Sequence, residues 1–239
     1  TPVQTTGTGG QWQARLISED GSHFAVLFEG VEQGEVRWSL TGQHSVANAL
    51  VTLAAARHVG VVPALGIAAL SQFQSVKRRM EKVAEVRGIT VYDDFAHHPT
   101  AIATTLDGLR KSVGDAQVIA VIEPRSNSMK LGAHRQGLPD SVVQADRVFW
   151  YAPPNLGWDL AATVAGSPVP TQVCDSLDAI IAGVKAHAAA GTQVVIMSNG
   201  GFGGLHGKLA QALAEDCEAC VARMQSGKRF NPDTIRATE

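Results

Sequence analysis

The chain has 239 residues, of which 45% are hydrophobic and 18% charged; this excludes a disordered protein and suggests one or two folded domains. The 20 basic and 22 acidic side chains give a formal net charge of −2, so the composition predicts no binding to nucleic acid or to an anionic membrane. Three cysteines do not make a disulfide framework and favour a reducing, cytoplasmic setting. No apolar run approaches the ~20 residues of a membrane span, and no signal peptide opens the chain. The first residue is Thr1 rather than Met, so we expect the sequence to begin part-way into a gene product.

The first third of the chain predicts three antiparallel strands followed by two helices. Apolar and polar residues alternate over Trp12–Leu16 and over residues 36–40, and a short apolar run covers residues 24–28. Residues 45–58 then place apolar side chains on one helical face, and residues 63–73 begin with a proline, which is favoured in the first turn of a helix.

In the rest of the chain, short apolar runs alternate with helical patterns, which is typical of a doubly wound α/β fold with a parallel sheet. The charged residues 77–86 lack an apolar rhythm, so we expect a connector there. The expected strands are residues 89–92, Val118–Ile122, 148–151 and 194–197, and the expected helices are residues 100–113, 140–145, 176–190 and 205–224.

Polar clusters follow three of these strands, at the point where each strand ends. Carboxyl ends of parallel strands meet at one edge of an open sheet, and ligands bind at that edge. Any one of these loops would by itself be explained as a capped turn, and His98 is placed to cap a helix that starts at Pro99. Three such loops on one edge favour a functional site. They are Asp93-Asp94-Phe95-Ala96-His97-His98-Pro99, then residues 123–130, and then Ser198-Asn199-Gly200-Gly201-Phe202-Gly203-Gly204-Leu205-His206.

The glycine-rich loop matches neither common nucleotide-binding pattern. A phosphate loop that ends in Gly207-Lys208 would need glycine in place of Phe202 and Ser or Thr in place of Leu209. A dinucleotide fingerprint would need its third glycine in place of His206. The backbone N–H groups at this helix start still suit a carboxylate or phosphate, although a tight packing turn explains the glycines equally well.

Five segments, in this order and spacing, resemble the Mur ligase family, whose members use ATP to join amino acids or peptides to UDP-N-acetylmuramate in peptidoglycan synthesis. Residues 123–130 and 198–204 narrow the resemblance to the branch that recycles the tripeptide L-alanyl-γ-D-glutamyl-meso-diaminopimelate. Ser45 departs from the family pattern, which has Asn there. The five segments are residues 42–50, 73–81, 92–100, 123–130 and 198–204.

The resemblance implies a domain organisation. The family has a UDP-binding domain, a central ATPase domain and a C-terminal Rossmann-like domain. We therefore expect residues 1–82 to be the end of the central domain, built of antiparallel strands and helices, and residues 83–239 to be the C-terminal domain. The family's phosphate loop lies upstream of the segments matched here, so this chain is not expected to be active alone.

The resemblance also implies the chemistry. ATP phosphorylates the muramate carboxylate, and the amine of the tripeptide attacks the acyl phosphate, with Mg²⁺ offsetting the phosphate charge. The main Mg²⁺ ligands are expected upstream, with none in this chain. By motif position, Asn48 contacts adenine, Arg79 a phosphate and Asp94 the ribose hydroxyls, and Arg79 and Asp94 take the catalytic roles. The implied nucleotide-binding residues are His44, Asn48, Arg79, Asp94 and His97, and the implied substrate-binding residues are His98, Arg125, Asn127, Lys130, Asn199, Gly200 and Gly201.

Three other functions compete with this interpretation. The L-alanine-adding member of the same family carries a nearly identical Asp-Asp-x-x-His-His-Pro motif, but the loops at residues 123–130 and 198–204 argue against it. A dinucleotide-binding oxidoreductase domain lacks the required glycine fingerprint. A non-catalytic peptide-binding domain would share the same rim of loops.

Overall fold

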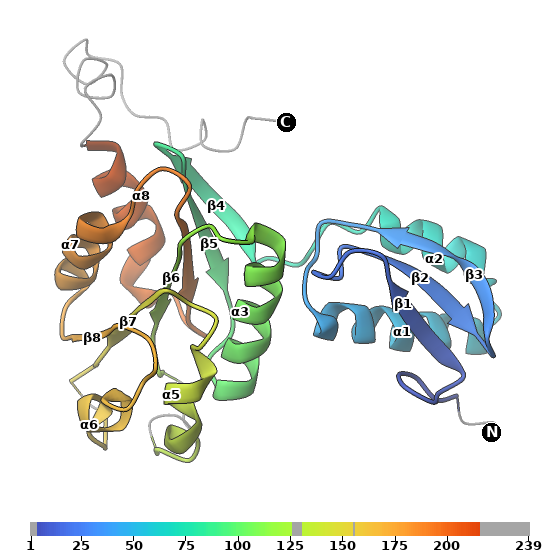
Figure 1. Cartoon of the computed structure of the whole chain (residues 1–239), viewed down its shortest axis with the longest axis horizontal. Coiled ribbons are helices and arrows are strands. Elements are labelled where there is room, and N and C mark those ends of the chain that lie inside the picture. Colours follow the sequence, from blue (N-terminus) through green and yellow to red (C-terminus); the bar gives the residue numbers. More distant parts are fainter. Residues whose placement is uncertain (1–3, 126–130, 155, 216–239) are drawn as a thin grey trace, which may run out of the picture. The chain divides into compact units, whose positions relative to one another are not determined.

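The computed structural model describes residues 4–125, 131–154 and 156–215 (Figure 1). The chain divides into two compact units, one of residues 1–76 with residues 107–114 and the other of residues 77–106 with residues 115–239. Within the described ranges, no helix has both the length and the hydropathy that a membrane span requires.

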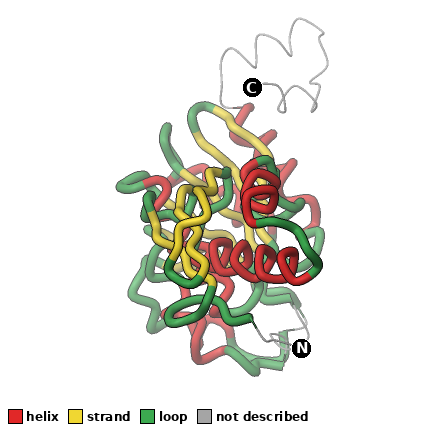
Figure 2. The backbone as a smooth tube through the Cα atoms, turned by 90° about the vertical axis from the view of Figure 1, so that its right-hand side faces the viewer, coloured by secondary structure: helices red, strands yellow, loops and turns green. Residues whose placement is uncertain are grey.

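The first unit is a three-stranded antiparallel sheet with two helices packed against it (Figures 1 and 2). Helix α1 packs against β1 and helix α2 against β3. Trp12, Phe24 and Val36 from the sheet and Leu50 and Leu53 from α1 form a core with no more than 3% of their surface exposed. The elements are β1 (Trp12–Leu16), β2 (His23–Phe28), β3 (Val31–Arg37), α1 (Gln43–His58) and α2 (Pro63–Ser71).

The third strand begins earlier than the sequence predicts. Strand β3 covers Val31–Arg37 rather than residues 36–40, because Glu29 and Gly30 form a tight turn directly after β2, with φ values of 50° and 79°. Two-residue turns with positive φ match the twist of the flanking strands. Most residues in the first part of β3 are polar, so they lack the alternation of apolar and polar residues from which a strand is predicted.

The second unit is a six-stranded sheet in the order β4-β5-β9-β6-β7-β8 (Figure 1). All neighbouring strands are parallel except β4 and β5, which are antiparallel. This confirms the expected α/β class with a doubly wound, mostly parallel sheet. The strands are β4 (Glu81–Val86), β5 (Ile89–Asp94), β6 (Val118–Ile122), β7 (Arg147–Tyr151), β8 (Thr171–Cys174) and β9 (Gln193–Met197). The helices are α3 (Pro99–Val113), α5 (Leu138–Ser141), α6 (Leu160–Val164), α7 (Leu177–His187) and α8 (Leu205–Glu215).

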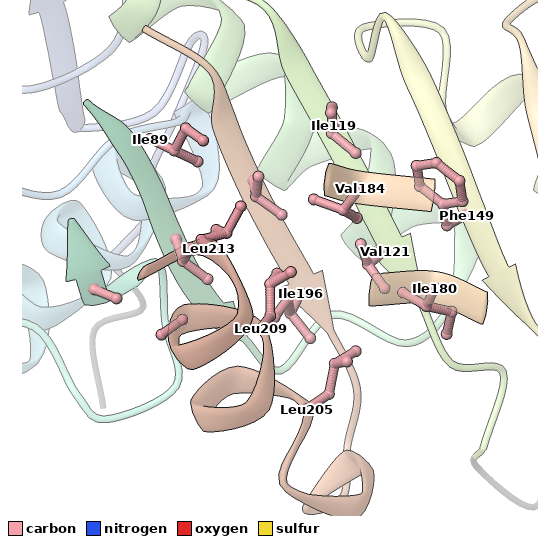
Figure 3. Close-up of a cluster of buried hydrophobic side chains, with 14 of the residues drawn as sticks. Ile89, Ile119, Val121, Phe149, Ile180, Val184, Ile196, Leu205, Leu209 and Leu213 are labelled. Carbon is pink, nitrogen blue, oxygen red and sulfur yellow. The ribbon is translucent and has the colours of Figure 1, made fainter. Parts of the chain in front are cut away.

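One face of this sheet packs against α7 and α8 (Figure 3). Ile119, Val121 and Ile196 on the strands meet Val184 on α7 and Leu209 on α8, and all five side chains are fully buried. Alternate strand residues point to the other face, which is why the strands read as continuous apolar runs. This packing holds the carboxyl ends of the strands in fixed positions.

The prediction of a connector at residues 77–86 is wrong for most of that segment, because Glu81–Val86 forms strand β4 at the sheet edge. Arg87 and Gly88, with φ values of 56° and 74°, make a two-residue turn that returns the chain into β5. The side chains of an edge strand are partly solvated, so its apolar pattern is weak. Strand β8 and the short helix α6, which has only five residues, are also absent from the elements predicted from the sequence.

Candidate functional site

The loops after β5, β9 and β6 start side by side. Strand β9 lies between the other two, and Asp94 and Ile122 both pair with Met197 at its end. The three polar clusters therefore leave the sheet at the same level, which confirms the expected rim. The backbone N–H of Ser198 donates to the carbonyl of Asp94 (3.1 Å), and that of Glu123 donates to the carbonyl of Met197 (3.0 Å).

Asp94 is almost completely buried, with 3% of its surface exposed. Its Oδ1 accepts from the backbone N–H of Ala96 (2.8 Å) and the hydroxyl of Thr105 (3.3 Å), and its Oδ2 accepts from the backbone N–H of Met80 (2.9 Å). Burial raises the pKa of this carboxyl above its ordinary value, although the hydrogen bonds and the charge of Arg79 act in the opposite direction. Asp94 thus ties the segment before β4 to the loop that follows β5.

Asp93 faces an arginine and a histidine. Its Oδ2 lies 3.2 Å from Nε of Arg78, and its Oδ1 lies 3.1 Å from Nε2 of His206 at the start of α8. Burial opposes ionisation of Asp93, but the contacts with His206 and Arg78 prevail and lower its pKa. The adjacent carboxyls therefore have opposite pKa shifts.

Arg79 is exposed, and its guanidinium carbon lies 5.4 Å from the ring centroid of Phe95. Its charge also acts on the buried carboxyl of Asp94. The predicted phosphate-binding arginine is therefore presented at the surface of the rim, beside the predicted ribose-binding carboxyl. A guanidinium in this position suits an anionic ligand.

The two histidines of the first loop have different environments. His97 Nδ1 lies 2.8 Å from the carbonyl of Phe95, and its ring meets that of His98 edge-on at 5.3 Å. His98 Nδ1 accepts a long hydrogen bond (3.4 Å) from the backbone N–H of Ala101, which confirms that His98 caps the helix starting at Pro99. Burial, and then the charges of His97 and His134, lower the pKa of His98.

The loops after β6 and β9 are joined through buried side chains. The hydroxyl of Ser198 donates to Oε2 of Glu123 (2.5 Å) and accepts from the backbone N–H of Gly200 (2.9 Å). Ser198 is fully buried and Glu123 is 7% exposed. The hydrogen bond therefore stabilises both loops in a single arrangement.

Arg125 lies against the glycine loop. A Cβ atom on Gly200 would fall 1.7 Å from Nη1 of Arg125, so only glycine leaves room for the guanidinium. Arg125 itself is exposed, Asn199 is half-buried and Gly201 is exposed. A cation and the backbone of the glycine loop are thus presented together, which suits a carboxylate.

The remaining predicted site residues of the described part lie in the first unit. His44 and Asn48 are one turn apart on α1, and both are exposed. Ser45, which replaces the family's Asn, is 7% exposed, and its hydroxyl donates to the carbonyl of Thr41 (2.7 Å). Ser45 therefore supports the start of α1 rather than facing solvent.

Asn127 and Lys130, two of the predicted substrate-binding residues, lie outside the described residues. In residues 4–125, 131–154 and 156–215, no three His, Cys, Asp or Glu side chains cluster as a metal site would require. The sequence suggested Arg78 only as part of a candidate phosphate clamp, Lys77-Arg78-Arg79, and gave no individual role to Glu123, Ser198 or His206, although these lie in segments that it singled out. Only the folded sheet brings them together, and their residue types alone would not have distinguished them.

A family model described as "Mur ligase, glutamate ligase domain" matches residues 78–200. The chain is 45% identical over 217 residues to the UDP-N-acetylmuramate–L-alanyl-γ-D-glutamyl-meso-2,6-diaminoheptandioate ligase of Escherichia coli strain K12, covering 90% of this chain and 48% of that protein. It is 42% identical to the Haemophilus influenzae ligase of the same name, covering 88% of this chain and 47% of the relative. The chain therefore spans about half the length of these curated relatives.

The structural comparison agrees. The murein peptide ligase of Psychrobacter arcticus superposes with a TM-score of 0.67 and 46% identity, over 87% of this chain and 45% of that one. A UDP-N-acetylmuramate–alanine ligase from Thermotoga maritima superposes with a TM-score of 0.72 at 20% identity, which shows a shared fold. Since the family model alone covers more than half of its residues, the chain belongs to the Mur ligase family.

Proposed function

We propose that this chain is part of an ATP-dependent ligase that joins L-alanyl-γ-D-glutamyl-meso-diaminopimelate to UDP-N-acetylmuramate through an acyl phosphate in peptidoglycan recycling. The reaction takes place in the cytoplasm, where ATP is available. Residues 1–82 serve as the end of the central ATP-binding domain, and residues 83–239 serve as the C-terminal domain. The printed names of the E. coli and H. influenzae relatives, at 45% and 42% identity, carry this proposal.

The rim geometry supports a division of roles between its two sides. On one side, exposed Arg79 and buried Asp94 lie together at the loop after β5. We assign ATP to this side: Arg79 contacts a phosphate, Asp94 serves the ribose, and His97 lies near the nucleotide. For His44 and Asn48, which are exposed on α1 of the first unit, we propose a role in nucleotide binding from their motif position alone.

On the other side, Arg125 lies against Gly200 in the loop after β9. We assign the tripeptide to this side, because its several carboxylates require guanidinium, ammonium and backbone N–H donors. The proposed contacts on this side are Arg125, Asn127, Lys130, Asn199, Gly200 and Gly201, joined by His98 from the loop after β5.

The residues of this chain act by positioning and by electrostatics, since an acyl phosphate mechanism needs no covalent bond to the protein. Arg79 offsets negative charge on the phosphate, and Arg125 orients the peptide so that its amine approaches the activated carboxylate. Mg²⁺, when bound, would neutralise phosphate charge, and we propose that its main ligands lie elsewhere in the enzyme.

The L-alanine ligase is the weaker alternative. The Leuconostoc citreum enzyme of that name is 39% identical over 132 residues, which is 55% of this chain. That likeness is lower and covers a shorter stretch than the likeness to the tripeptide ligases. Nothing favours a dinucleotide-binding oxidoreductase over either ligase.

A chimera tests the proposal. Residues 1–239 replace the aligned part of the E. coli relative, and the purified chimera receives ATP, Mg²⁺ and UDP-N-acetylmuramate together with either tripeptide or L-alanine. We expect ligation of the tripeptide and none of L-alanine, measured by mass spectrometry of the UDP-linked product. Preferential ligation of L-alanine, or no ligation by a folded chimera, would contradict the proposal.

A further inference from the structure

The side chain of Arg78 joins segments that are far apart in the sequence. Its Nη2 donates to the carbonyls of Ser198 (2.5 Å) and Gly200 (2.7 Å), and its Nε donates to Oδ2 of Asp93 (3.2 Å). The guanidinium carbon also lies 5.2 Å from the ring centroid of Phe95. One side chain therefore connects the segment before β4, the loop after β5 and the loop after β9.

The backbone of Arg78 is held as firmly as its side chain. Its N–H donates to Oε2 of Glu81 (2.9 Å), and its carbonyl accepts from the backbone N–H of Phe95 (2.9 Å). Its φ is 62°, a left-handed conformation that is strained for an arginine. A non-glycine residue keeps this conformation only where surrounding contacts compensate for it, and the contacts of the guanidinium provide that compensation.

These contacts determine where the glycine loop lies. The two carbonyls that Arg78 holds belong to Ser198 and Gly200, and Gly200 is the residue against which Arg125 packs. The neighbouring Arg79 also lies over the ring of Phe95, but its charge acts on Asp94. It is Arg78 whose side chain reaches the carbonyls of Ser198 and Gly200, so this arginine holds the glycine loop.

We propose that Arg78 is a positioning residue for the amine substrate: it holds residues 198–204 against Arg125, and so sets the affinity for the peptide rather than for ATP. The choice of the peptide as the affected substrate rests on the proposed function above. The role of Arg78 in holding the loop rests only on the contacts that its side chain and backbone make. His206 supports the same arrangement, because it lies 3.1 Å from the other carboxylate oxygen of Asp93.

Arginine is required for this role. Its guanidinium offers several N–H donors in a fixed plane and reaches two carbonyls and a carboxylate at once, whereas a lysine ammonium is a single point of contact on a flexible stem. Arg78→Lys therefore keeps the charge but loses part of the loop contacts. Arg78→Gly removes all of them and also relieves the left-handed backbone.

Arg87 provides a matched control. It is also an arginine with a positive φ, 56°, and it lies at the opposite end of β4 from Arg78. Arg87→Gly removes one positive charge and the same kind of backbone strain, but leaves the contacts to Ser198 and Gly200 intact. Hydrogen exchange in the glycine loop of this variant is expected to equal that of the unmodified chain.

Hydrogen exchange of the 239-residue chain tests whether Arg78 holds the glycine loop in place. Arg78→Gly should accelerate exchange of the backbone amides of residues 198–204 by about tenfold, with a smaller acceleration in Arg78→Lys and none in Arg87→Gly. Unchanged exchange in β6 and β7 would show that the sheet remains folded. If Arg78→Gly does not fold, the comparison of Arg78→Lys with Arg87→Gly decides whether Arg78 holds the loop. Equal exchange of residues 198–204 in the Arg78 variants and in unmodified protein would overturn the proposal.

Kinetics of the chimera test whether Arg78 affects binding of the tripeptide or of ATP. Arg78→Lys should raise KM for the tripeptide by about tenfold and leave KM for ATP nearly unchanged. A merely destabilising role would not separate the two constants. An equal effect on both, or an effect on ATP alone, would overturn the role assigned to Arg78. If the unmodified chimera ligates no tripeptide, the proposed function fails and the substrate assignment with it, while hydrogen exchange still decides whether Arg78 holds the loop.

Discussion

The guanidinium of Arg125 occupies the space beside the α-carbon of Gly200 that any larger residue would need. A Cβ atom at position 200 would lie 1.7 Å from Nη1 and 2.4 Å from Cζ of Arg125. Because Arg125 is exposed, it can move away when that space is filled. The position of its charge therefore depends on the absence of a side chain in the neighbouring loop.

We predict that Gly200→Ala reproduces the effect of Arg125→Ala. Both changes should raise KM for the tripeptide by about tenfold in the chimera, with a much smaller effect on KM for ATP, because both remove the guanidinium from the rim. Gly166→Ala is the control, since a Cβ there has no atom within 4 Å. A selective effect of Arg125→Ala on ATP would reassign this loop to the nucleotide.

Arg79→Ala should act on the nucleotide instead. Loss of a guanidinium that offsets phosphate charge is expected to lower kcat/KM for ATP by well over tenfold, which is at least ~1.4 kcal/mol of transition-state stabilisation. Steady-state kinetics of the chimera with varied ATP measure the effect, with Arg87→Ala as the control for loss of one positive charge. An unchanged kcat/KM would remove Arg79 from the site.

The adjacent carboxyls Asp93 and Asp94 should have opposite effects on stability as the pH changes. The pKa of Asp93 is lowered, so its contribution to stability is complete above its ordinary value of 3.8 and is lost as the pH falls through the lowered value. The pKa of Asp94 is raised, so its contribution is complete below 3.8 and is lost as the pH rises through the raised value.

Asp93→Asn should therefore cost more free energy of unfolding at about pH 7 than at about pH 3, and the cost of Asp94→Asn should change in the opposite direction. Urea titrations with pulse-labelling hydrogen exchange of residues 89–94 measure both variants at each pH. Asp107→Asn, which removes a partly exposed ion pair with Lys111, should show only a small change. Parallel pH trends for Asp93→Asn and Asp94→Asn would contradict the assigned pKa directions.

Gly183→Ala should destabilise the second unit although alanine is normally the better helix residue. A Cβ at position 183 on α7 would lie 2.3 Å from Cε1 of Phe149, which is fully buried on β7. Overpacking of this kind costs about 1–3 kcal/mol, which outweighs the roughly 1 kcal/mol that alanine gains in a helix. Gly207→Ala, in α8 with nothing within 4 Å, should instead be neutral or stabilising in thermal unfolding. Equal stability of the two variants would contradict the packing argument.

The 239-residue chain alone should not ligate. Its sequence contains no Gly-x-x-x-x-Gly-Lys-Ser/Thr phosphate loop, and the failed match around Phe202 and Leu209 leaves the ATP phosphates without that cradle. Incubation with ATP, Mg²⁺, UDP-N-acetylmuramate and tripeptide should yield neither product nor phosphate. Turnover by the purified chain would show that residues 1–239 hold a complete active site.

The rim was predictable because polar clusters directly follow apolar runs, as at Asp93 and Ser198. The cap at His98 was predictable from the proline after it. Strand β4 was not, because its side chains are partly solvated and its register depends on pairing with β5. The contacts of Arg78 were not predictable either, since its partners lie 120 and 122 positions later in the chain. Burial of Asp94 is likewise a property of the fold, and the residues around it do not reveal it.

The place of β9 has a consequence for synthesis on the ribosome. Among the described strands of the sheet, residues 193–197 are the last to be made, yet they lie between β5 and β6. A nascent chain that ends before residue 193 leaves two central strands with unpaired N–H and C=O groups, which are templates for aggregation. We therefore expect truncations within α7 to be insoluble, and the second unit to complete its folding only after β9 has left the ribosome.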